Sequence, residues 1–227
     1  MLPIAPSVSY TENDASLNIT KGVLSQAVVV DFSRSIYDTT ECATFTELIA
    51  ATNSHPYVIM TRMLFSGDEI SNIQNVVSDA GDWLFNATAS LSWSKSEKWD
   101  TIPEGERVSR EVIKAAGDAY LDNWGNYSVK VPYGTPCARL EGGLYTGSKS
   151  PTTNTCTMGQ FPEPLKVGNR RYVIDEEVGA MNIFNDFPFI DTAKPNGTAS
   201  TNLFRVEAGL IRYIHEVTIC TNTNCGR

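Results

Sequence analysis

The stretch Asn202-Leu-Phe-Arg-Val-Glu-Ala-Gly-Leu-Ile-Arg-Tyr-Ile-His-Glu-Val-Thr-Ile-Cys220 decides the fold. It predicts two strands joined by a tight turn at Ala208-Gly209, because glycine readily adopts the positive φ that such a turn needs. After the turn, apolar and polar side chains alternate with a period of two, which is typical of a half-buried strand. His215 lies on the apolar face of this strand. Both a structural role for it and a proton-handling role on a concave sheet face stay open.

The composition limits the class of protein. A chain of 227 residues can form one large domain or two small ones. Its formal net charge of −8 argues against nucleic acid and anionic membrane as partners. No apolar run approaches the ~20 residues of a membrane-spanning helix. The N-terminal Met1-Leu-Pro-Ile-Ala-Pro6 has no signal-peptide pattern, and we expect that a leader has been removed.

Cysteines and sequons indicate an oxidising compartment. The five cysteines form no CxxC pair, and with only two histidines a metal site is not expected. We expect Cys137–Cys156 to be a disulfide, since the loop between them is rich in glycine, proline and threonine. Cys42, Cys220 and Cys225 compete for a second bridge. Four glycosylation sequons add to the prediction of a secreted or endomembrane-lumen protein: Asn18, Asn86, Asn126 and Asn196.

Local patterns predict the remaining elements. A capping box at Thr44 and Glu47 predicts a short helix over 45–52. The clearest helix is predicted over 104–124, and Trp93 and Trp99 fall in a predicted polar loop. We expect strands over 57–65, 69–77, 169–175 and 179–187, and turn-rich loops over 131–150 and 188–202.

Two internal similarities suggest a repeat. The segment Arg34-Ser-Ile-Tyr-Asp38 parallels Arg171-Tyr-Val-Ile-Asp175, and the strand pair within 57–77 parallels the pair within 203–219. We therefore expect an α+β fold of two similar units, residues 1–95 and 96–227. The first unit lacks an opening helix. An apolar sheet left uncovered for this reason predicts a homodimer.

No nucleotide-binding or hydrolase motif occurs, and no cofactor is expected. Charged and aromatic residues gather instead on the predicted strands of the second unit. For any one of them, an ion pair or a solvated strand edge is the more frequent role. A curved sheet covered by a helix that ends in tryptophan nevertheless predicts an apolar small-molecule site with a few polar groups.

Several segments together resemble the DUF8021 family: Tyr10-Thr-Glu-Asn13, Cys42-Ala-Thr-Phe-Thr-Glu-Leu48, His55-Pro-Tyr-Val-Ile59, Gly81-Asp-Trp-Leu-Phe85, Pro136-Cys-Ala-Arg-Leu-Glu-Gly-Gly143, Asn169-Arg-Arg-Tyr-Val-Ile-Asp175, Phe204-Arg-Val-Glu207 and Ile211-Arg-Tyr-Ile-His215. The resemblance implies two NTF2-like (SnoaL-like) cones in tandem, arranged as a pseudo-dimer. It also implies kinship with fungal, mostly secreted proteins that include the hetero-Diels–Alderases of tropolone–sesquiterpenoid biosynthesis. Two departures are a missing N-terminal helical segment and Ser200-Thr-Asn202, where the family tends to have Asp-Ser-His.

The resemblance implies a cofactor-independent pericyclase. Such an enzyme would dehydrate a precursor to a quinone methide and join it to a humulene-type alkene. His215 and Tyr172 are the expected proton donors, Asp175 or Glu216 would orient or accept, and Arg139 or Arg171 would bind an acidic oxygen. The residues expected to contact substrate are Trp99, Trp124, Phe184, Phe187, Asn202 and Tyr213. The alternative is a secreted protein that binds an apolar small molecule, or acts as an effector, without chemistry.

Overall fold

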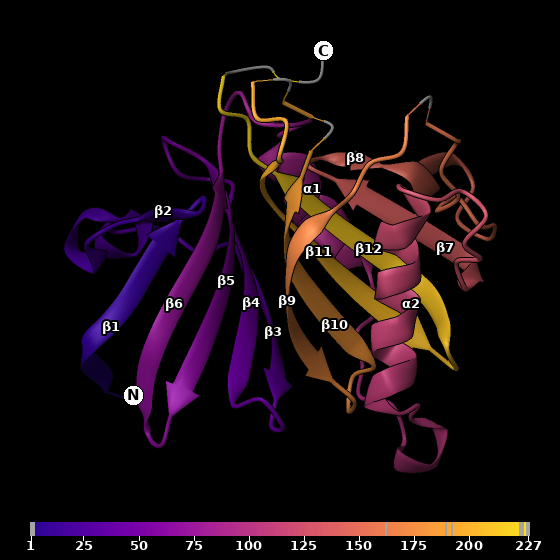
Figure 1. Cartoon of the computed structure of the whole chain (residues 1–227), viewed down its shortest axis with the longest axis horizontal. Coiled ribbons are helices and arrows are strands. Elements are labelled where there is room, and N and C mark those ends of the chain that lie inside the picture. The colour runs from indigo at the N-terminus through magenta and orange to yellow at the C-terminus, as the bar shows by residue number, and fades with distance from the viewer. Residues whose placement is uncertain (1–2, 162, 189, 192, 223–224, 226–227) are drawn as a thin grey trace.

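The computed structural model describes residues 3–161, 163–188, 190–191, 193–222 and 225. They form two six-stranded sheets and two α-helices (Figure 1). The first sheet consists of β1 (Ile4–Glu12), β2 (Ala15–Ser16), β3 (Phe32–Asp38), β4 (Ala43–Ala50), β5 (Tyr57–Ser66) and β6 (Glu69–Ser78). The second consists of β7 (Tyr133–Glu141), β8 (Leu144–Tyr145), β9 (Gly168–Asp175), β10 (Ala180–Phe187), β11 (Thr198–Glu207) and β12 (Leu210–Thr218).

Helices lie between and beside the sheets. The α-helices are α1 (Ala87–Ser96) and α2 (Arg110–Asn123), and the short 3₁₀ turns are η1 (Ile19–Lys21), η2 (Val23–Ser25), η3 (Glu104–Glu106) and η4 (Thr146–Lys149). Helix α1 contacts β4, β5 and β8, whereas α2 lies across β9, β10 and β11 (Figure 1). Among the described residues, no α-helix lies on the matching face of the first sheet, and η2 lies beside Glu12 at the β1 edge.

The two sheets have the same topology. Their strand orders are β2-β1-β6-β5-β4-β3 and β8-β7-β12-β11-β10-β9. In each sheet the first strand pairs in parallel with the last, and the other neighbours are antiparallel. Each final hairpin even has its register shift at the same place, after Leu64 in one and after Arg205 in the other. The segments that are similar in sequence therefore fall on corresponding strands, β3 with β9 and β5–β6 with β11–β12.

The two sheets meet edge to edge through reciprocal hydrogen bonds between β3 and β9. The backbone N–H of Tyr37 donates to Asp175 Oδ2 (2.8 Å), and the N–H of Ile174 donates to Asp38 Oδ2 (2.9 Å). Arg110 of α2 adds two hydrogen bonds of 2.7 Å to the Asp38 carboxylate. The exchange of like contacts by corresponding residues is the pattern of an isologous interface, here formed within one chain.

Two cores hold the structure together. One lies between the sheets, where Phe45 and Met60 of the first sheet pack with Phe184 and Leu203 of the second. The other lies under α2, whose Ile113, Ala116 and Tyr120 pack on β9–β12. The second sheet is consequently buried on both faces.

Most predicted strands are confirmed. The hairpins at 57–65/69–77 and 169–175/179–187 match β5–β6 and β9–β10, and the stretch 202–220 forms the β11–β12 hairpin. Its turn residues Ala208 and Gly209 both have positive φ, at 50° and 79°. The long helix begins later than predicted, because 104–106 form η3 and α2 starts at Arg110.

Four local predictions were wrong. The helix predicted over 45–52 is β4, because Phe45, Glu47 and Ile49 alternate with partly exposed neighbours and are buried against the second sheet. The predicted polar loop around Trp93 is α1, which Asn86 caps by accepting a hydrogen bond from the Ala89 N–H. The predicted loops over 131–150 and 188–202 contain β7 with β8 and the start of β11.

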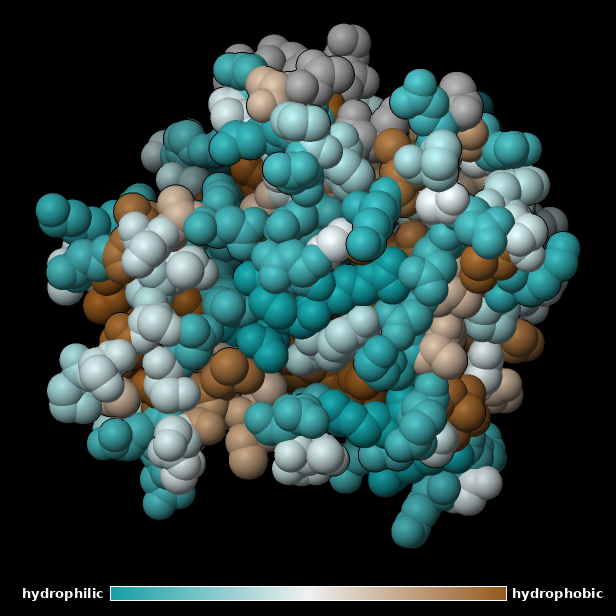
Figure 2. Space-filling model, in the orientation of Figure 1, coloured by the Kyte–Doolittle hydropathy of each residue, from teal (hydrophilic) through white to brown (hydrophobic). Residues whose placement is uncertain are grey.

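The open face of the first sheet bears on the predicted homodimer. It carries Thr44, Thr46 and Thr61 beside Leu48 and Met63, so it is not the apolar surface that we expected. Figure 2 shows hydrophilic side chains over the middle of the molecule and hydrophobic ones in small separate patches. This view offers no continuous apolar area of the kind that marks an interface. The homodimer stays a prediction without support from this face.

Candidate functional site

The second sheet and α2 enclose a group of polar side chains. Glu216 of β12 is paired with Glu141 of β7 in the strand register, which brings two carboxylates onto neighbouring strands. Strand alternation directs both of them to the face that α2 covers, together with Ile214. Asn202 of β11 donates a hydrogen bond of 3.3 Å to Glu216 Oε2.

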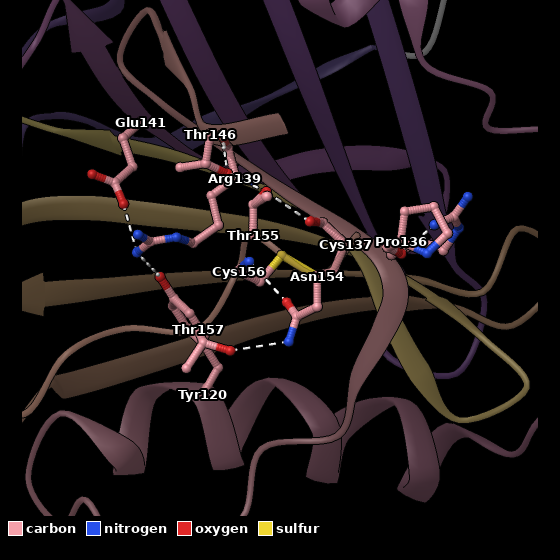
Figure 3. Close-up of a disulfide and its surroundings, with 11 residues drawn as sticks. Tyr120, Pro136, Cys137, Arg139, Glu141, Thr146, Asn154, Thr155, Cys156 and Thr157 are labelled. Carbon is pink, nitrogen blue, oxygen red and sulfur yellow. Dashed lines mark hydrogen bonds and ion pairs between the residues drawn. A yellow bond between two sulfur atoms is a disulfide. The ribbon is translucent and has the colours of Figure 1, made fainter. Parts of the chain in front are cut away.

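Arg139 lies at the centre of this group. Its Nη1 is 2.6 Å from Glu141 Oε1 and donates to the hydroxyl of Tyr120 at 3.4 Å (Figure 3). Tyr120 belongs to α2 and is fully buried, so the helix and the sheet meet at the guanidinium. The group thus contains one ion pair and one further carboxyl, that of Glu216.

Burial decides the protonation of Glu216. It raises the pKa of Glu216 to about 8, and the nearby charge of Glu141 adds to the increase, against the opposing effect of Arg139. At neutral pH this side chain therefore holds a proton, while Glu141 forms the ion pair with Arg139. A carboxylic acid with a pKa close to the working pH suits general acid catalysis.

A cavity of about 190 Å³ with both polar and apolar walls borders these residues. At roughly 30 Å³ per water, it has room for about six water molecules, or one small ring. Its polar lining includes Arg139, Glu141 and Glu216, and its apolar lining consists of Trp83, Trp124, Met158, Phe161, Phe187 and Ile190. Trp124 stacks on Phe161 (4.4 Å between ring centroids) and meets Phe187 edge-on (4.8 Å).

Two buried polar atoms of the group have no hydrogen-bond partner among the described residues. They are Nε of Arg139 and Oδ1 of Asn185. The Asn185 amide donates to Asn202 Oδ1 at 2.9 Å and so belongs to the same network as Glu216. Buried donors and acceptors are normally paired, and a bound ligand is one way to pair them.

The predicted Cys137–Cys156 disulfide is confirmed, and it lies next to the strand segment that carries Arg139. Cys137 and Cys156 are bonded, and their bridge holds residues 153–157 against β7 (Figure 3). The Arg139 N–H donates to Thr146 Oγ1, which also contacts Thr155. The second bridge is Cys220–Cys225, which leaves Cys42 as the exposed free thiol.

His215 lies on the opposite face of β12 from Glu216, between the two sheets. Its Nδ1 is 2.7 Å from Glu47 of the first sheet, and its Nε2 is 2.7 Å from Glu97 after α1. Burial lowers the pKa of His215, but the two carboxylates outweigh this and raise it to about 9. With Arg34 bonded to Glu47 at 3.1 Å, two cations and two anions form one enclosed cluster. This geometry places His215 in the interior of the interface and outside the cavity.

The other predicted residues divide between the cavity and the rest of the fold. The cavity gathers Arg139, Glu216, Trp124 and Phe187, and Asn202 reaches it through Glu216. The remainder lie elsewhere. Tyr172 donates a hydrogen bond to Asp118 of α2, Arg171 forms an ion pair with Asp14, and Asp175 accepts a hydrogen bond from β3. Phe184 contacts Phe45 edge-on, and Trp99 packs on Arg34, Tyr213 and His215.

The sequence reasoning did not identify Tyr120 and Asn185 as members of the site. The one local signal for Tyr120 is its spacing of four from Trp124, which places both rings on one face of the helix. Asn185 has no comparable signal.

The four sequon asparagines are all exposed, as glycosylation requires. In two of them, Asn18 and Asn126, the side-chain oxygen accepts from the hydroxyl of the sequon's own Thr20 or Ser128. Their modification stays a prediction.

Comparison with known proteins gives one match. Residues 106–218 match the family model described as a domain of unknown function, DUF8021. This range extends from just before α2 to the end of β12, and it includes Tyr120, Arg139, Glu141, Asn202 and Glu216. No curated protein and no solved structure matches the chain. In the described residues, no helix combines the length and the apolar character that crossing a bilayer demands. The chain belongs to the DUF8021 family.

Proposed function

We propose that the second sheet and α2 form an NTF2-like cone that works as a cofactor-independent acid–base cyclase of the hetero-Diels–Alderase type. The observation that carries the proposal is the buried Glu216, whose pKa is raised to about 8 next to an Arg139–Glu141 ion pair. The catalytic group of this proposal is Glu216 with Arg139, Glu141 and Tyr120. His215, Tyr172 and Asp175 have no part in it, because none of them lines this cavity.

The first step is the loss of water from a hydroxymethyl group on an acidic ring. Glu216 gives its proton to the leaving hydroxyl, the C–O bond breaks, and water departs. The ring hydroxyl loses its proton, which returns to the Glu216 carboxylate, so that the product is a neutral quinone methide. Arg139 stabilises the negative charge on the ring oxygen as that proton leaves.

The second step joins the quinone methide to an alkene and transfers no proton. One C–C and one C–O bond form as the dihydropyran ring closes. Here the protein contributes by excluding water from the intermediate and by holding the two partners at reacting distance. The walls for this purpose are Trp124, Phe161 and Phe187. Because the cavity has room for only one ring, the larger terpenoid partner would lie at its mouth.

Two further proposals rest on other features of the chain. The two disulfides, together with the exposed sequons, support secretion or an endomembrane lumen as the location. The shared strand order and the reciprocal Asp38 and Asp175 contacts support a tandem pseudo-dimer of two such cones.

The small cavity favours one alternative, a protein that binds a single ring without reaction. The test uses a tropolonic hydroxymethyl precursor and a humulene-type alkene, with Glu216→Gln as the test variant. Glu69→Gln, at an exposed position of the first sheet, is the matched control. We expect adduct from the wild type and the control, and little from Glu216→Gln. If the wild type gives no more adduct than buffer, the cyclase proposal is wrong. Binding of the tropolonic ring alone, measured by calorimetry, would then support the alternative.

A further inference from the structure

A second cavity, of about 240 Å³, lies on the other side of β7 and β12 from the cone. It is bordered by the end of α1, by β7, by the turn η4 and by β12. Six of its lining residues matter here: Trp93, Glu97, Tyr145, Ser148, Arg212 and Tyr213. Glu216 does not line this cavity, and none of these six residues lines the cavity of the cone.

The lining of this cavity includes a buried carboxylate with one oxygen outside the hydrogen bonds of the cluster. The side chain of Glu97 is only 1% exposed. Its Oε2 accepts from the Trp99 indole N–H at 2.9 Å and lies 2.7 Å from His215 Nε2. Its Oε1 is buried and has no hydrogen-bond partner among the described residues. Oε2 is turned toward the interface. On the cavity side, burial and the Glu97 carboxylate both raise the pKa of the Tyr145 hydroxyl, so a ligand hydroxyl would share Oε1 with this neighbouring group.

The charges around Glu97 indicate whether the ligand group that donates a hydrogen bond to it is cationic or neutral. Glu97 and Glu47 carry two negative charges, and Arg34 and protonated His215 carry two positive ones within the same buried cluster. The cluster is therefore neutral without a ligand. An added cation would leave an unbalanced buried charge, whereas a neutral hydroxyl would not.

The walls combine aromatic faces with hydroxyl groups. Trp93 and Tyr145 stack at 4.3 Å with an angle of 12° between their planes, and Tyr213 supplies a third ring. Ser148 and the Tyr145 hydroxyl lie among the polar groups of the lining, and Arg212 is fixed by the carbonyl of Pro136. Flat apolar surfaces next to hydrogen-bonding groups fit a ligand with an apolar face and a hydroxylated edge.

We propose that this cavity binds a neutral, hydroxylated ring of monosaccharide size, with one ligand hydroxyl donating to Glu97 Oε1. The aromatic rings contact the C–H face of the sugar. The serine and tyrosine hydroxyls bind its remaining hydroxyl groups.

The experiment titrates the full-length protein with glucose, galactose, mannose and N-acetylglucosamine, and follows saturation-transfer NMR and tryptophan fluorescence. We expect at least one sugar to bind at millimolar concentration. Trp93→Leu and Tyr145→Phe should each weaken that binding about tenfold, because the first removes an aromatic wall contact and the second removes a hydrogen-bonding hydroxyl. Glu216→Gln and Tyr37→Phe should bind the sugar as the wild type does. Melting temperatures confirm that each variant is folded.

Three results would overturn the proposal. One is the absence of binding by every sugar in the panel. Another is equal binding by the wild type and the two wall variants, which would place the ligand elsewhere. The third is binding of methylammonium in place of the sugars, which would make this a cation site.

Discussion

The two sheets share a strand order but bury different polar groups at matching positions. In the second sheet, Glu216 is paired with Glu141 and Asn202 in the register. The corresponding residue of the first sheet is Asn75, which is paired with Glu12 and Thr61. Tyr10 likewise stands where the second sheet has Arg139. Each of them is paired with the residue two positions earlier on the last strand, Ile73 or Ile214.

In the first sheet, the polar side chains at these positions form hydrogen bonds with one another and with nearby backbone groups. Thr61 donates to Asn75 Oδ1 at 2.7 Å, and the Asn75 amide donates to the Thr11 carbonyl at 3.2 Å. Glu12 accepts from the Tyr10 hydroxyl and from the Val23 N–H of η2. The corresponding group of the second sheet keeps a protonated acid and two unpaired polar atoms. The same scaffold can therefore hold a structural polar group or a candidate site, depending on whether its buried polar groups already have hydrogen-bond partners.

The largest expected effect is on the rate of adduct formation when the acid Glu216 is replaced, and it tests the contrast between the two sheets. We predict that Glu216→Gln lowers the rate of adduct formation by about 10²–10⁴, the range for a lost general acid. Asn75→Asp, at the matching position of the first sheet, should leave the rate unchanged, although it can lower the melting temperature. Parallel rate measurements on the two variants make the comparison. Equal losses of rate would contradict the assignment of the site to the second sheet.

The next prediction concerns the buried cluster between the sheets. His215→Ala leaves Glu47 and Glu97 buried without their shared partner, and we expect a loss of about 3–5 kcal/mol in the free energy of unfolding. Gln74→Ala, at the matching position of β6, should cost about 1 kcal/mol, the usual contribution of a single hydrogen bond. Urea unfolding measures both. A cost for His215→Ala as small as that of the control would show that the cluster does not stabilise the fold.

Replacing either of the reciprocal aspartates at the junction of β3 and β9 should lower the free energy of unfolding by less than His215→Ala does, and by different amounts. Asp38 holds Arg110 as well as a backbone N–H, so we expect Asp38→Asn to cost about 2–3 kcal/mol. Among the described residues, Asp175 accepts from backbone N–H groups alone, and Asp175→Asn should cost about 1 kcal/mol. Thermal and urea unfolding of both variants provide the measurement. The reverse order would indicate that Arg110 contributes nothing to the junction.

The last prediction concerns the dependence of stability on pH. The pKa of His215 is raised to about 9 in the folded protein, so its stabilisation is complete below its ordinary value of 6.5 and is lost as pH rises through 9. The pKa of Glu216 is also raised, from 4.5 to about 8. Because the folded state keeps this proton when the unfolded state has lost it, stability falls between these two pH values.

A substitution at Glu216 distinguishes its contribution to the pH dependence of stability from that of His215. Glu216→Gln should remove the slope at the acid end and keep the fall of stability toward pH 9 that belongs to His215. Unfolding curves at a series of pH values test this, and an unchanged acid-side slope in the variant would contradict the raised pKa of Glu216. The rate should also fall as pH rises through about 8, since the proposed acid is then ionised.

The sequence alone determined features that depend on neighbours in the chain. Strand alternation and the Ala208-Gly209 turn predicted the β11–β12 hairpin, and the short loop composition predicted Cys137–Cys156. The likeness of 34–38 to 171–175 anticipated that β3 and β9 correspond. Local signals failed for β4, where a capping-box pattern at Thr44 and Glu47 competed with burial against a sheet far away in the sequence, and burial prevailed.

Only the tertiary structure decided which residues form the candidate site. His215 and Glu216 are neighbours, and the pleat of β12 alone determines that they point to opposite faces. Nothing in the sequence says which face α2 covers and which face meets the first sheet. That choice places Glu216 beside a cavity and encloses His215 between Glu47 and Glu97. It depends on contacts between segments more than a hundred residues apart, and the pattern of a single strand contains no information about them.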